Sequence, residues 1–270
     1  MELHQDGSEP QFGSSPQSVT VTKKADHVAD NQAKKGSKVI HSAPPNLNLP
    51  IDLKSSNSWA SWLERLPLRQ GQQVARPRQT IYRAGEALDG VPVICDGWAA
   101  RVSRLSDGRR QILSFVLPGD LVSTNAVFAG SLNFFVEAIT TVRHSSYDRA
   151  DLNERLGAEP SLIKILVGAC LAEKDEIDQL ATNLGRRRAE ERIARLFLHL
   201  KERLDARGLV RDQSFALPLR QQHIADATGL TPVHVNRVLG ALRTEGLIEL
   251  SSGILKIANP AGLQRIADLR

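Results

Sequence analysis

The sequence predicts an α+β protein in which a roll of short antiparallel strands precedes a long helix and a small helical unit ending in a two-stranded hairpin. Three observations support this prediction. Between residues 79 and 147, short apolar runs alternate with Asp-Gly and related turns at roughly ten-residue spacing, as in all-β domains. Residues 161–184 then carry apolar side chains at helical spacing. Last, two short helical patterns lie on either side of a glycine, and two apolar runs around a Ser-Ser-Gly turn follow them.

The length and composition fit a globular chain of two modest domains. The 270 residues are 41% hydrophobic, which is enough for two separate cores. No run of about 18 apolar residues occurs, so we expect no membrane span. The acidic N-terminal residues lack the apolar stretch of a secretory signal. Cys95 and Cys170 lie far apart without a CxxC motif, which favours a reducing cytoplasm over a structural zinc site or a cysteine-held iron–sulfur cluster.

Changes of composition along the chain predict four parts. Residues 1–56 are rich in Ser, Gln, Asn, Pro and Lys, and we expect them to form a disordered tail. Residues 57–150 are expected to form the roll, which opens with a short amphipathic helix over residues 58–66. The long helix falls within residues 151–184, and residues 185–270 form the C-terminal unit with its hairpin.

Turn motifs mark the strands of the predicted roll. They are AGE at 84–86, DG at 89–90, 96–97 and 107–108, PGD at 118–120 and AGS at 129–131. The apolar runs between them, VPVIC, WAARVSRL, RQILSFVL and FFVEAITTV, have the length of strands. The stretch SDGR at 106–109 carries the strongest two-residue turn signal, so we expect a hairpin there.

Pro160 starts a long helix whose apolar side chains approximate a heptad seam. The seam consists of Ile163, Leu166, Cys170, Ile177, Leu180 and Leu184, and Glu173 interrupts it. A stripe of this length exceeds what one small roll can cover, which favours pairing with the same helix of a second subunit. The alternative is that the helix packs on its own roll.

The C-terminal unit has the element order of a winged helix-turn-helix. Residues 185–208 predict a helix with Ile193, Leu196, Phe197, Leu200 and Leu204 along one face. A short helix is expected within residues 217–230, where Gly229 turns the chain. A second short helix follows from Pro232, and residues 248–257 predict the hairpin, or wing.

The helix that begins at Pro232 has two faces of different chemistry. Val235, Val238, Leu239 and Leu242 follow helical spacing and are expected to face a core. At 100° per residue, an outer group lies near the opposite pole, with His234 and Asn236 beside it; this group is Val233, Arg237, Gly240 and Thr244. Thr231 is expected to cap the helix, and Gly246 to end it.

A basic unit with this motif predicts DNA binding, with the second helix in the major groove. Residues 185–270 carry 15 Lys/Arg against 9 Asp/Glu, which suits a polyanionic partner. Arg237 can donate to both acceptors of a guanine, and Val233 can touch a thymine methyl group. His234 and Asn236 are further candidates for base contacts. The candidates for phosphate contacts lie at ends and turns and are Thr231, Gln222, Arg243 and Ser251.

From about residue 79 to residue 269, the chain resembles a bacterial regulator of the Crp/Fnr family. The likeness is carried by TIYRAGEALDGVPVICDGWAARV, LSDGRRQILSFVLPGDLV, the long helix and LRQQHIADATGLTPVHVNRVLGALRTEGLI. The resemblance implies a jelly-roll-like β-roll of the cyclic-nucleotide-binding type, a long dimerisation helix and a C-terminal winged helix-turn-helix. It also implies a cytoplasmic homodimer that binds a palindromic site in double-stranded DNA and acts on RNA polymerase.

The sequence departs from the family at the ligand site of the roll. Members that bind cyclic nucleotides hold the ribose with a Gly-Glu pair and the phosphate with an Arg-Ser or Arg-Thr pair. The matching positions here are Ser123-Thr124 and Leu132-Asn133, which supply neither the carboxylate nor the cation. We therefore expect no cyclic-nucleotide binding of the usual kind.

Three further comparisons with the family shape the prediction. The N-terminal cysteine cluster of the oxygen-sensing branch is absent, so no iron–sulfur cofactor is expected. His144, the one histidine of the predicted roll, is interpreted as a surface or strand-end residue rather than a haem ligand. In the recognition helix, Arg237 matches the guanine-reading Arg of the family, while Val233 replaces a frequent Glu, which implies a changed half-site.

Other functions are weighed on the same residues. A cupin-like metal enzyme needs an HxH pair, a Glu and a further His, which the roll cannot supply. We therefore expect no catalytic, cofactor-binding or metal-binding residue. A redox switch could use Cys170 on the helix seam, where a disulfide would lock a dimer; the alternative for Cys170 is a small buried hydrophobe. Control by abundance, without any effector, is a third possibility.

Overall fold

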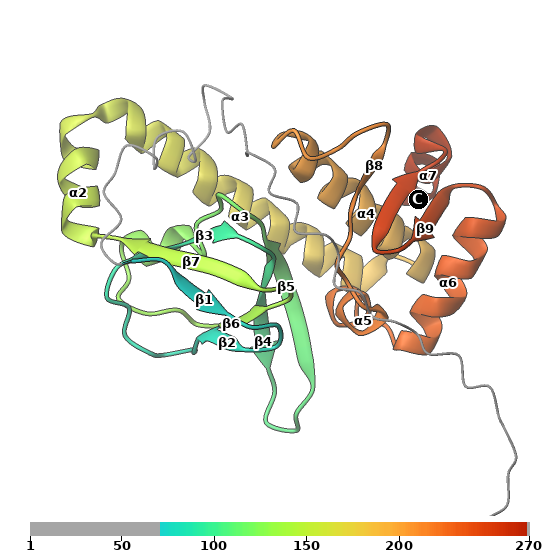
Figure 1. Cartoon of the computed structure of the whole chain (residues 1–270), viewed down its shortest axis with the longest axis horizontal. Coiled ribbons are helices and arrows are strands. Elements are labelled where there is room, and N and C mark those ends of the chain that lie inside the picture. The colour runs from blue at the N-terminus through green and yellow to red at the C-terminus, as the bar shows by residue number, and fades with distance from the viewer. Residues whose placement is uncertain (1–70, 269–270) are drawn as a thin grey trace, which may run out of the picture. The chain divides into compact units, whose positions relative to one another are not determined.

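The computed structural model describes residues 71–268, all of which lie within the compact unit Pro44–Arg270. Figure 1 shows the strands of the roll, the long helix α3 and the helices and strands of the C-terminal unit. The predicted tail over residues 1–56 and the predicted helix over residues 58–66 lie outside the described residues.

The roll is built from two antiparallel sheets. One sheet has the order β1-β7-β3 and the other β2-β6-β4-β5. The strands are β1 (Gln73–Ala75), β2 (Thr80–Tyr82), β3 (Val91–Asp96), β4 (Ala99–Arg104), β5 (Arg110–Val116), β6 (Phe135–Ala138) and β7 (Val142–Tyr147), with a 3-10 turn η1 (Thr124–Val127) between β5 and β6. Strand β4 pairs with β5 from Ala99↔Val116 to Arg104↔Arg110, so the hairpin predicted at SDGR is confirmed.

Apolar side chains of both sheets meet inside the roll, because alternate residues of a strand point to the same face. The fully buried members include Val91, Ile94, Ala99, Val122, Val136 and Val142. The Asp-Gly turns allow the strands to reverse. At the turn between β3 and β4, the Asp96 carboxylate accepts a hydrogen bond from the N–H of Gly97 at 2.9 Å. Gly97 itself has a φ of +79°, a backbone conformation that residues other than glycine rarely adopt.

Two helices follow the roll. Helix α2 (Arg149–Ala158) begins at Asp148, whose carboxylate accepts a hydrogen bond from the N–H of Ala150 at 2.7 Å. Helix α3 (Pro160–Arg186) begins at the proline that the sequence singles out, because proline suits the first turn of a helix. Leu162 and Leu166 of α3 are buried against the core of the roll.

The apolar seam predicted along α3 is wrong in its register. Leu166 is buried in the core of the roll and Cys170 packs partly against that core, whereas Ile163 and Ile177 are exposed. The large apolar side chains that α3 leaves exposed are Ile163, Val167, Leu171 and Ile177. The register differs because α3 uses the face of Leu162 and Leu166 to cover its own roll. The alternative in which α3 packs on its own roll is confirmed. Pairing with a second subunit stays a prediction.

The helix predicted over residues 185–208 begins later than expected. Helix α3 continues to Arg186, the chain is extended at Arg187 and Arg188, and α4 (Ala189–Asp205) starts only then. The Arg192 guanidinium explains the interruption, because it donates hydrogen bonds to the carbonyls of Leu184 and Arg187 at 3.0 and 2.9 Å. Those carbonyls are satisfied by a side chain, so the helix can stop between them.

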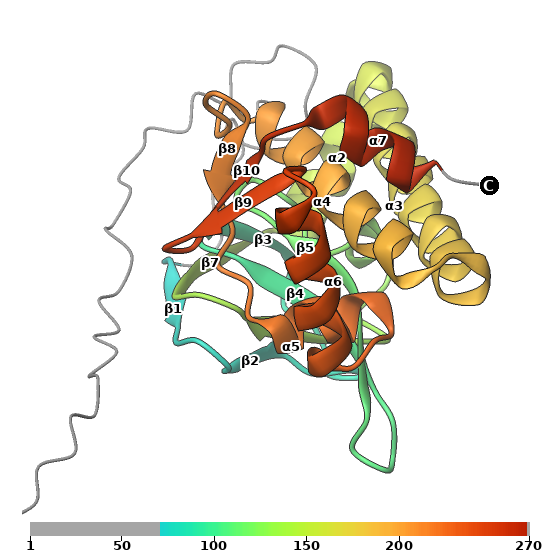
Figure 2. The same ribbon diagram turned by 90° about the vertical axis from the view of Figure 1, so that its right-hand side faces the viewer.

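The C-terminal unit has the predicted winged helix-turn-helix order with two additions. Its remaining elements are β8 (Ser214–Ala216), α5 (Gln221–Thr228), α6 (Pro232–Thr244), β9 (Ile248–Ser251), β10 (Ile254–Ile257) and α7 (Pro260–Ala267). Strand β8 makes the wing a three-stranded sheet of order β8-β10-β9, and helix α7 closes the unit; neither element is predicted from the sequence. Figure 2 shows these strands beside α6 and α7. The fully buried Phe197 and Leu200 of α4 belong to the core of this unit, together with Val235 of α6.

We predict that Gly97→Ala destabilises the fold more than Gly108→Ala. Both glycines have positive φ, +79° and +86°, so alanine is strained at either position by about 1 kcal/mol or more. A Cβ at Gly97 would also lie 2.1 Å from the carbonyl oxygen of Thr141, whereas a Cβ at Gly108 meets nothing within 4 Å. Overpacking of this kind adds roughly 1–3 kcal/mol. Urea unfolding of both variants measures the difference, and equal midpoints would contradict the steric argument.

Candidate nucleic-acid interface

Helix α6 divides into an inner and an outer face as the sequence predicts. Its inner side chains Val235, Val238, Leu239 and Leu242 are all buried in the core of the C-terminal unit. On the outer face, Val233 is 81% exposed. Arg237 and Thr244 are exposed too. Among residues 71–268, Val233 is the most exposed large apolar side chain.

The turn between α5 and α6 has Gly229 at one end and the helix cap Thr231 at the other. The Thr231 hydroxyl accepts a hydrogen bond from the N–H of His234 at 3.2 Å, which confirms the predicted cap. Helix α5 ends at Gly229, whose φ is +66°. The positive φ favours glycine, and a Cβ at Gly229 would lie 2.6 Å from Cδ2 of Leu184 at the end of α3, so another residue would push this leucine side chain aside. The first turn of α6 is therefore placed by α5 and α3 together.

Two of the predicted base-contacting side chains are oriented by neighbours. Nη2 of Arg237 lies 3.0 Å from Nε2 of His234, one turn earlier on α6. The side-chain amide of Gln221, at the start of α5, donates to Oδ1 of Asn236 at 3.0 Å. Among residues 71–268, no ion pair engages Arg237, so its guanidinium remains available to an anionic or acceptor-rich partner.

The predicted phosphate contacts form a less uniform set. The Gln222 amide donates to the carboxylate of Asp226 at 2.6 Å, so one of its N–H groups is already used. Nε of Arg243 donates to the carbonyl of Leu239 at 3.0 Å, and the side chain is exposed at the end of α6. Ser251 is exposed at the end of β9, beside the wing turn. Thr231 thus lies at the start of α6 and Arg243 in its last turn, while Gln222 belongs to α5 and Ser251 to the wing.

Gln221 was not predicted as a site residue, although its position at the start of α5 and its contact with Asn236 place it at the same surface.

The ionic contacts between the roll and α5 were not predicted either. Arg110 of β5 lies between Glu137 of β6 and Asp226 of α5. Nη1 of Arg110 is 2.9 Å from Oε2 of Glu137, and Nε is 2.7 Å from Oδ2 of Asp226 without the alignment of a hydrogen bond. These partners are distant in the sequence, so no spacing signal could have paired them.

In the roll, the structure corrects the interpretation of His144. It lies within β7 and is buried, with Nδ1 3.0 Å from the hydroxyl of Tyr82, so it is neither a surface nor a strand-end residue. Burial lowers the pKa of His144, because the charged ring loses hydration. Within residues 71–268, no cluster of His, Cys, Asp and Glu is arranged to hold a metal ion.

Both cysteines are half-buried at the edge of the roll core. Burial raises the pKa of the Cys95 thiol, although the neighbouring Arg143 opposes the effect. Cys170 packs against the same core, which is the environment of a small hydrophobe. A redox role for Cys170 stays a prediction.

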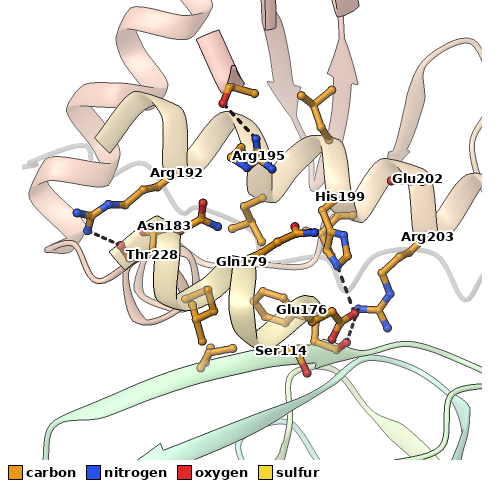
Figure 3. Close-up of a pocket in the computed structure, with 18 of the residues that line it drawn as sticks. Ser114, Glu176, Gln179, Asn183, Arg192, Arg195, His199, Glu202, Arg203 and Thr228 are labelled. Atoms are coloured by element: carbon orange, nitrogen blue, oxygen red, sulfur yellow. Dashed lines mark hydrogen bonds and ion pairs between the residues drawn. The ribbon is translucent and has the colours of Figure 1, made fainter. Parts of the chain in front are cut away.

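A cluster of charged side chains joins the roll, α3 and α4. Oε2 of Glu176, on α3, lies 3.1 Å from Nη2 of Arg101 on β4. Oε1 of Glu176 lies 3.3 Å from Nε2 of His199 and 3.3 Å from Nη1 of Arg203, both on α4. Arg203 also contacts Asp120 of the PGD turn at 2.6 Å. Figure 3 shows Glu176 facing His199 and Arg203 at one side of an open cleft of about 290 Å³.

This cluster changes the ionisation of Glu176. Burial alone would raise the pKa of the carboxyl, but the His199 hydrogen bond and the positive charges of Arg203 and Arg101 outweigh it and lower the pKa to about 2. The carboxylate is therefore charged throughout the physiological range and holds two helices and the roll together by charge.

Two domain families match most of the described chain. The cyclic nucleotide-binding domain matches residues 72–158, and the Crp-like helix-turn-helix domain matches residues 191–266. Within residues 71–268, none of the helices combines the length and apolarity that crossing a membrane requires.

Similar proteins include known regulators. The nitrogen fixation regulation protein FixK of Rhizobium meliloti is 34% identical over 195 residues, which are 72% of this chain and 85% of that protein. The FixK protein of Bradyrhizobium diazoefficiens is 29% identical over 77% of this chain and 88% of its own length. The solved structure of FixK2 from Bradyrhizobium japonicum has a TM-score of 0.67 and 27% identity, and the match covers 74% of this chain and 98% of that one.

We predict that the stability contributed by Glu176 disappears in acid. Its pKa is about 2 when folded against an ordinary 4.5, so the contribution is complete above pH 4.5 and is lost as the pH falls toward 2. Glu176→Gln should therefore unfold more easily than the wild type at pH 7, by at most about 3 kcal/mol, and the gap should close between pH 5 and pH 2. Thermal unfolding across that range measures it.

The matched control is Glu154→Gln, which removes an exposed carboxylate of α2 and should change stability by no more than about 0.5 kcal/mol. A gap between wild type and Glu176→Gln that stays constant down to pH 2 would show that the charge of Glu176 is not what stabilises the cluster.

Proposed function

The chain belongs to the Crp/Fnr family of DNA-binding transcription regulators, and on that basis we propose that it binds a two-fold symmetric site in double-stranded DNA as a homodimer. The observation that carries this proposal is the outer face of α6, where Val233 is 81% exposed and Arg237 has no carboxylate partner within residues 71–268. In this proposal α6 lies in the major groove of each half-site. Residues 57–150 serve as a sensor-type domain, 151–184 as the dimerisation helix and 185–270 as the DNA-binding domain.

The chemistry of α6 favours a particular division of roles. The Arg237 guanidinium can donate to O6 and N7 of a guanine, and Val233 offers a methyl surface for a thymine. Asn236, whose oxygen accepts from Gln221, is left with its amide hydrogens to donate to a base acceptor. His234 lies against Arg237 and can contact a base or hold the arginine in place.

Phosphate contacts are assigned to the rim of this surface. The group consists of Thr231, Gln222, Arg243 and Ser251, with the free N–H groups of Gln222 and Arg243 as donors. These contacts fix the position of α6 without reading sequence, and they make the affinity dependent on salt.

The proposal includes no cyclic-nucleotide control. The Ser123-Thr124 pair, which stands at the family's ligand site, engages a side chain of α3 instead of an open cavity. RNA polymerase is the proposed protein partner and the cytoplasm the proposed compartment, both on the strength of family membership. A transcription regulator of this kind needs no catalytic residue.

The exposed stripe of α3 supports the homodimer. Ile163, Val167, Leu171 and Ile177 lie on a helix of 27 residues and are 41–57% exposed in a single chain. Exposed apolar side chains repeated along one side of a long helix are stabilised by packing against a second helix. Pairing α3 with its copy would bury them around a two-fold axis.

We predict that Arg237→Ala loses about 1–3 kcal/mol of affinity for the preferred site and relaxes base choice at one position of each half-site. The measurement is a selection from random double-stranded DNA with purified, reduced protein and no added ligand. The wild type should select a palindrome whose half-sites are about 34–36 Å apart, one helical turn.

Arg243→Ala is the comparison for Arg237→Ala. It should weaken selected and random DNA alike and lower the slope of affinity against salt concentration by about one phosphate contact. If Arg237→Ala also weakened both kinds of DNA equally, Arg237 would not read a base.

We predict that Leu171→Glu converts the dimer to a monomer and reduces affinity for the full palindrome. A charge placed at the centre of an apolar helix pair is left without solvent or partner. Sedimentation velocity measures the mass, and Leu105→Glu is the control, because Leu105 is similarly exposed, 53% against 57%, but lies in the β4–β5 hairpin. A dimer that survives Leu171→Glu would exclude this face of α3 as the interface.

A further inference from the structure

One carboxylate of α3 is bound inside the roll by several donors. The Ser123 hydroxyl donates to Oε1 of Glu173 at 2.9 Å, and the N–H and hydroxyl of Thr124 donate to Oε2 at 2.9 and 2.7 Å. The Arg101 guanidinium forms an ion pair with the same carboxylate. We call the three donor residues, Arg101, Ser123 and Thr124, the anion cradle.

The anion cradle is part of the buried structure of the roll. Arg101 is 8% exposed and Ser123 is 2% exposed. The guanidinium lies 5.7 Å from the ring centroid of Phe134, so it is covered on one face by an aromatic side chain. A buried cation and the buried hydroxyl of Ser123 are costly without a partner, so this site is stabilised by an anion.

Glu173 is one of two carboxylates of α3, with Glu176, that meet the buried Arg101. Burial alone would raise the pKa of Glu173, but Arg101 and the hydrogen bonds from Thr124 and Ser123 lower it below its ordinary value. The side chain is therefore held as a carboxylate, the form that the cradle is built to receive.

The cradle is coupled to the DNA-binding unit by a second contact of the same arginine. Arg101 also lies 3.1 Å from Glu176, one turn along α3. Glu176 in turn meets His199 and Arg203 of α4, the first helix of the C-terminal unit. A change in the cradle would move Arg101, and with it the charge that positions α4.

We propose that the anion cradle is a binding site for a small carboxylate and that Glu173 is the carboxylate that the chain itself supplies. By filling the site, Glu173 latches α3 to the roll, so that α4 and the DNA-binding helices are positioned without a soluble effector. The consequence for regulation rests on the proposed function, whereas the binding site does not.

The proposal is tested by removing the internal carboxylate and adding an external one. Glu173→Ala removes the atoms of an acetate ion from the side chain and leaves the cradle in place. Sodium acetate at about 50 mM is compared with sodium chloride at the same ionic strength, because salt alone changes stability and DNA affinity. The control variant is Asp175→Ala, which removes an exposed carboxylate of the same helix.

The first readout is thermal unfolding, which does not depend on DNA. The Glu173→Ala protein should melt below the wild type, and acetate should raise its melting temperature more than chloride does, while wild type and Asp175→Ala show no such difference. Glu173→Gln, which keeps the shape without the charge, should melt at a lower temperature than the wild type and gain little from acetate. Equal effects of acetate and chloride on Glu173→Ala would overturn the anion site.

The second readout is affinity for the DNA site selected by the wild type. Glu173→Ala should bind that site about tenfold or more weakly, a typical size for coupling between two sites, and acetate should restore most of the loss. A melting temperature rescued by acetate with unchanged DNA affinity would overturn the coupling to DNA binding and leave the carboxylate site standing. If the wild type selected no DNA site, the proposed function would fail, and the melting experiment would still decide the carboxylate site.

Discussion

The buried guanidinium of Arg101 is the constraint on which the arrangement of the other helices depends. A largely buried cation needs an anionic partner, and Arg101 is paired with two carboxylates from successive turns of α3, Glu173 and Glu176. That requirement fixes which side of α3 lies on the roll. It therefore also fixes which side is left free, and the free side carries the apolar stripe around Leu171.

The same constraint extends from the roll to the DNA-binding surface. Glu176 pairs with both Arg101 and Arg203, and Arg203 and Arg207 both pair with Asp120 in the PGD turn of the roll. At the far side of the contact, Arg110 connects the β5 strand to Asp226 of α5. One apolar cluster also includes side chains of β4, β5 and α4. The contact between the roll and the C-terminal unit thus has an apolar part, which is non-directional, and charged pairs, which favour one orientation of the two.

Much of the fold could be predicted from local sequence signals, because the physics there is local. The Asp-Gly turns, Pro160, Thr231 and the spacing of Val235 and Leu239 each act within a few residues, and the structure follows all of them. The short strand β8 has only three residues and pairs with β10, so its own sequence carries little signal. Helix α7 comes after the wing, where the motif order that guided the prediction had already ended.

What the sequence could not provide is the effect of long-range pairing. The seam along α3 was assigned from spacing alone, but the choice of its buried face is made by Arg101 and by Leu162 against the roll. The burial of His144 depends on Tyr82 from a different strand. At the candidate interface, the residue types and the helix faces could be predicted from the sequence. The hydrogen bonds that join Gln221 to Asn236 and His234 to Arg237 could be identified only from the structure.

The interruption between α3 and α4 has a mechanical meaning. At Arg187 and Arg188 no helical ladder crosses the joint, and the guanidinium of Arg192 ties it instead, with bonds to the carbonyls of Leu184, Arg187 and Thr228. With these three bonds, one side chain joins the end of α3, the joint itself and the end of α5. The direction in which α4 leaves α3 is therefore held by a side chain and not by a continuous backbone ladder. One substitution at Arg192 would thus release the end of α5 together with the joint.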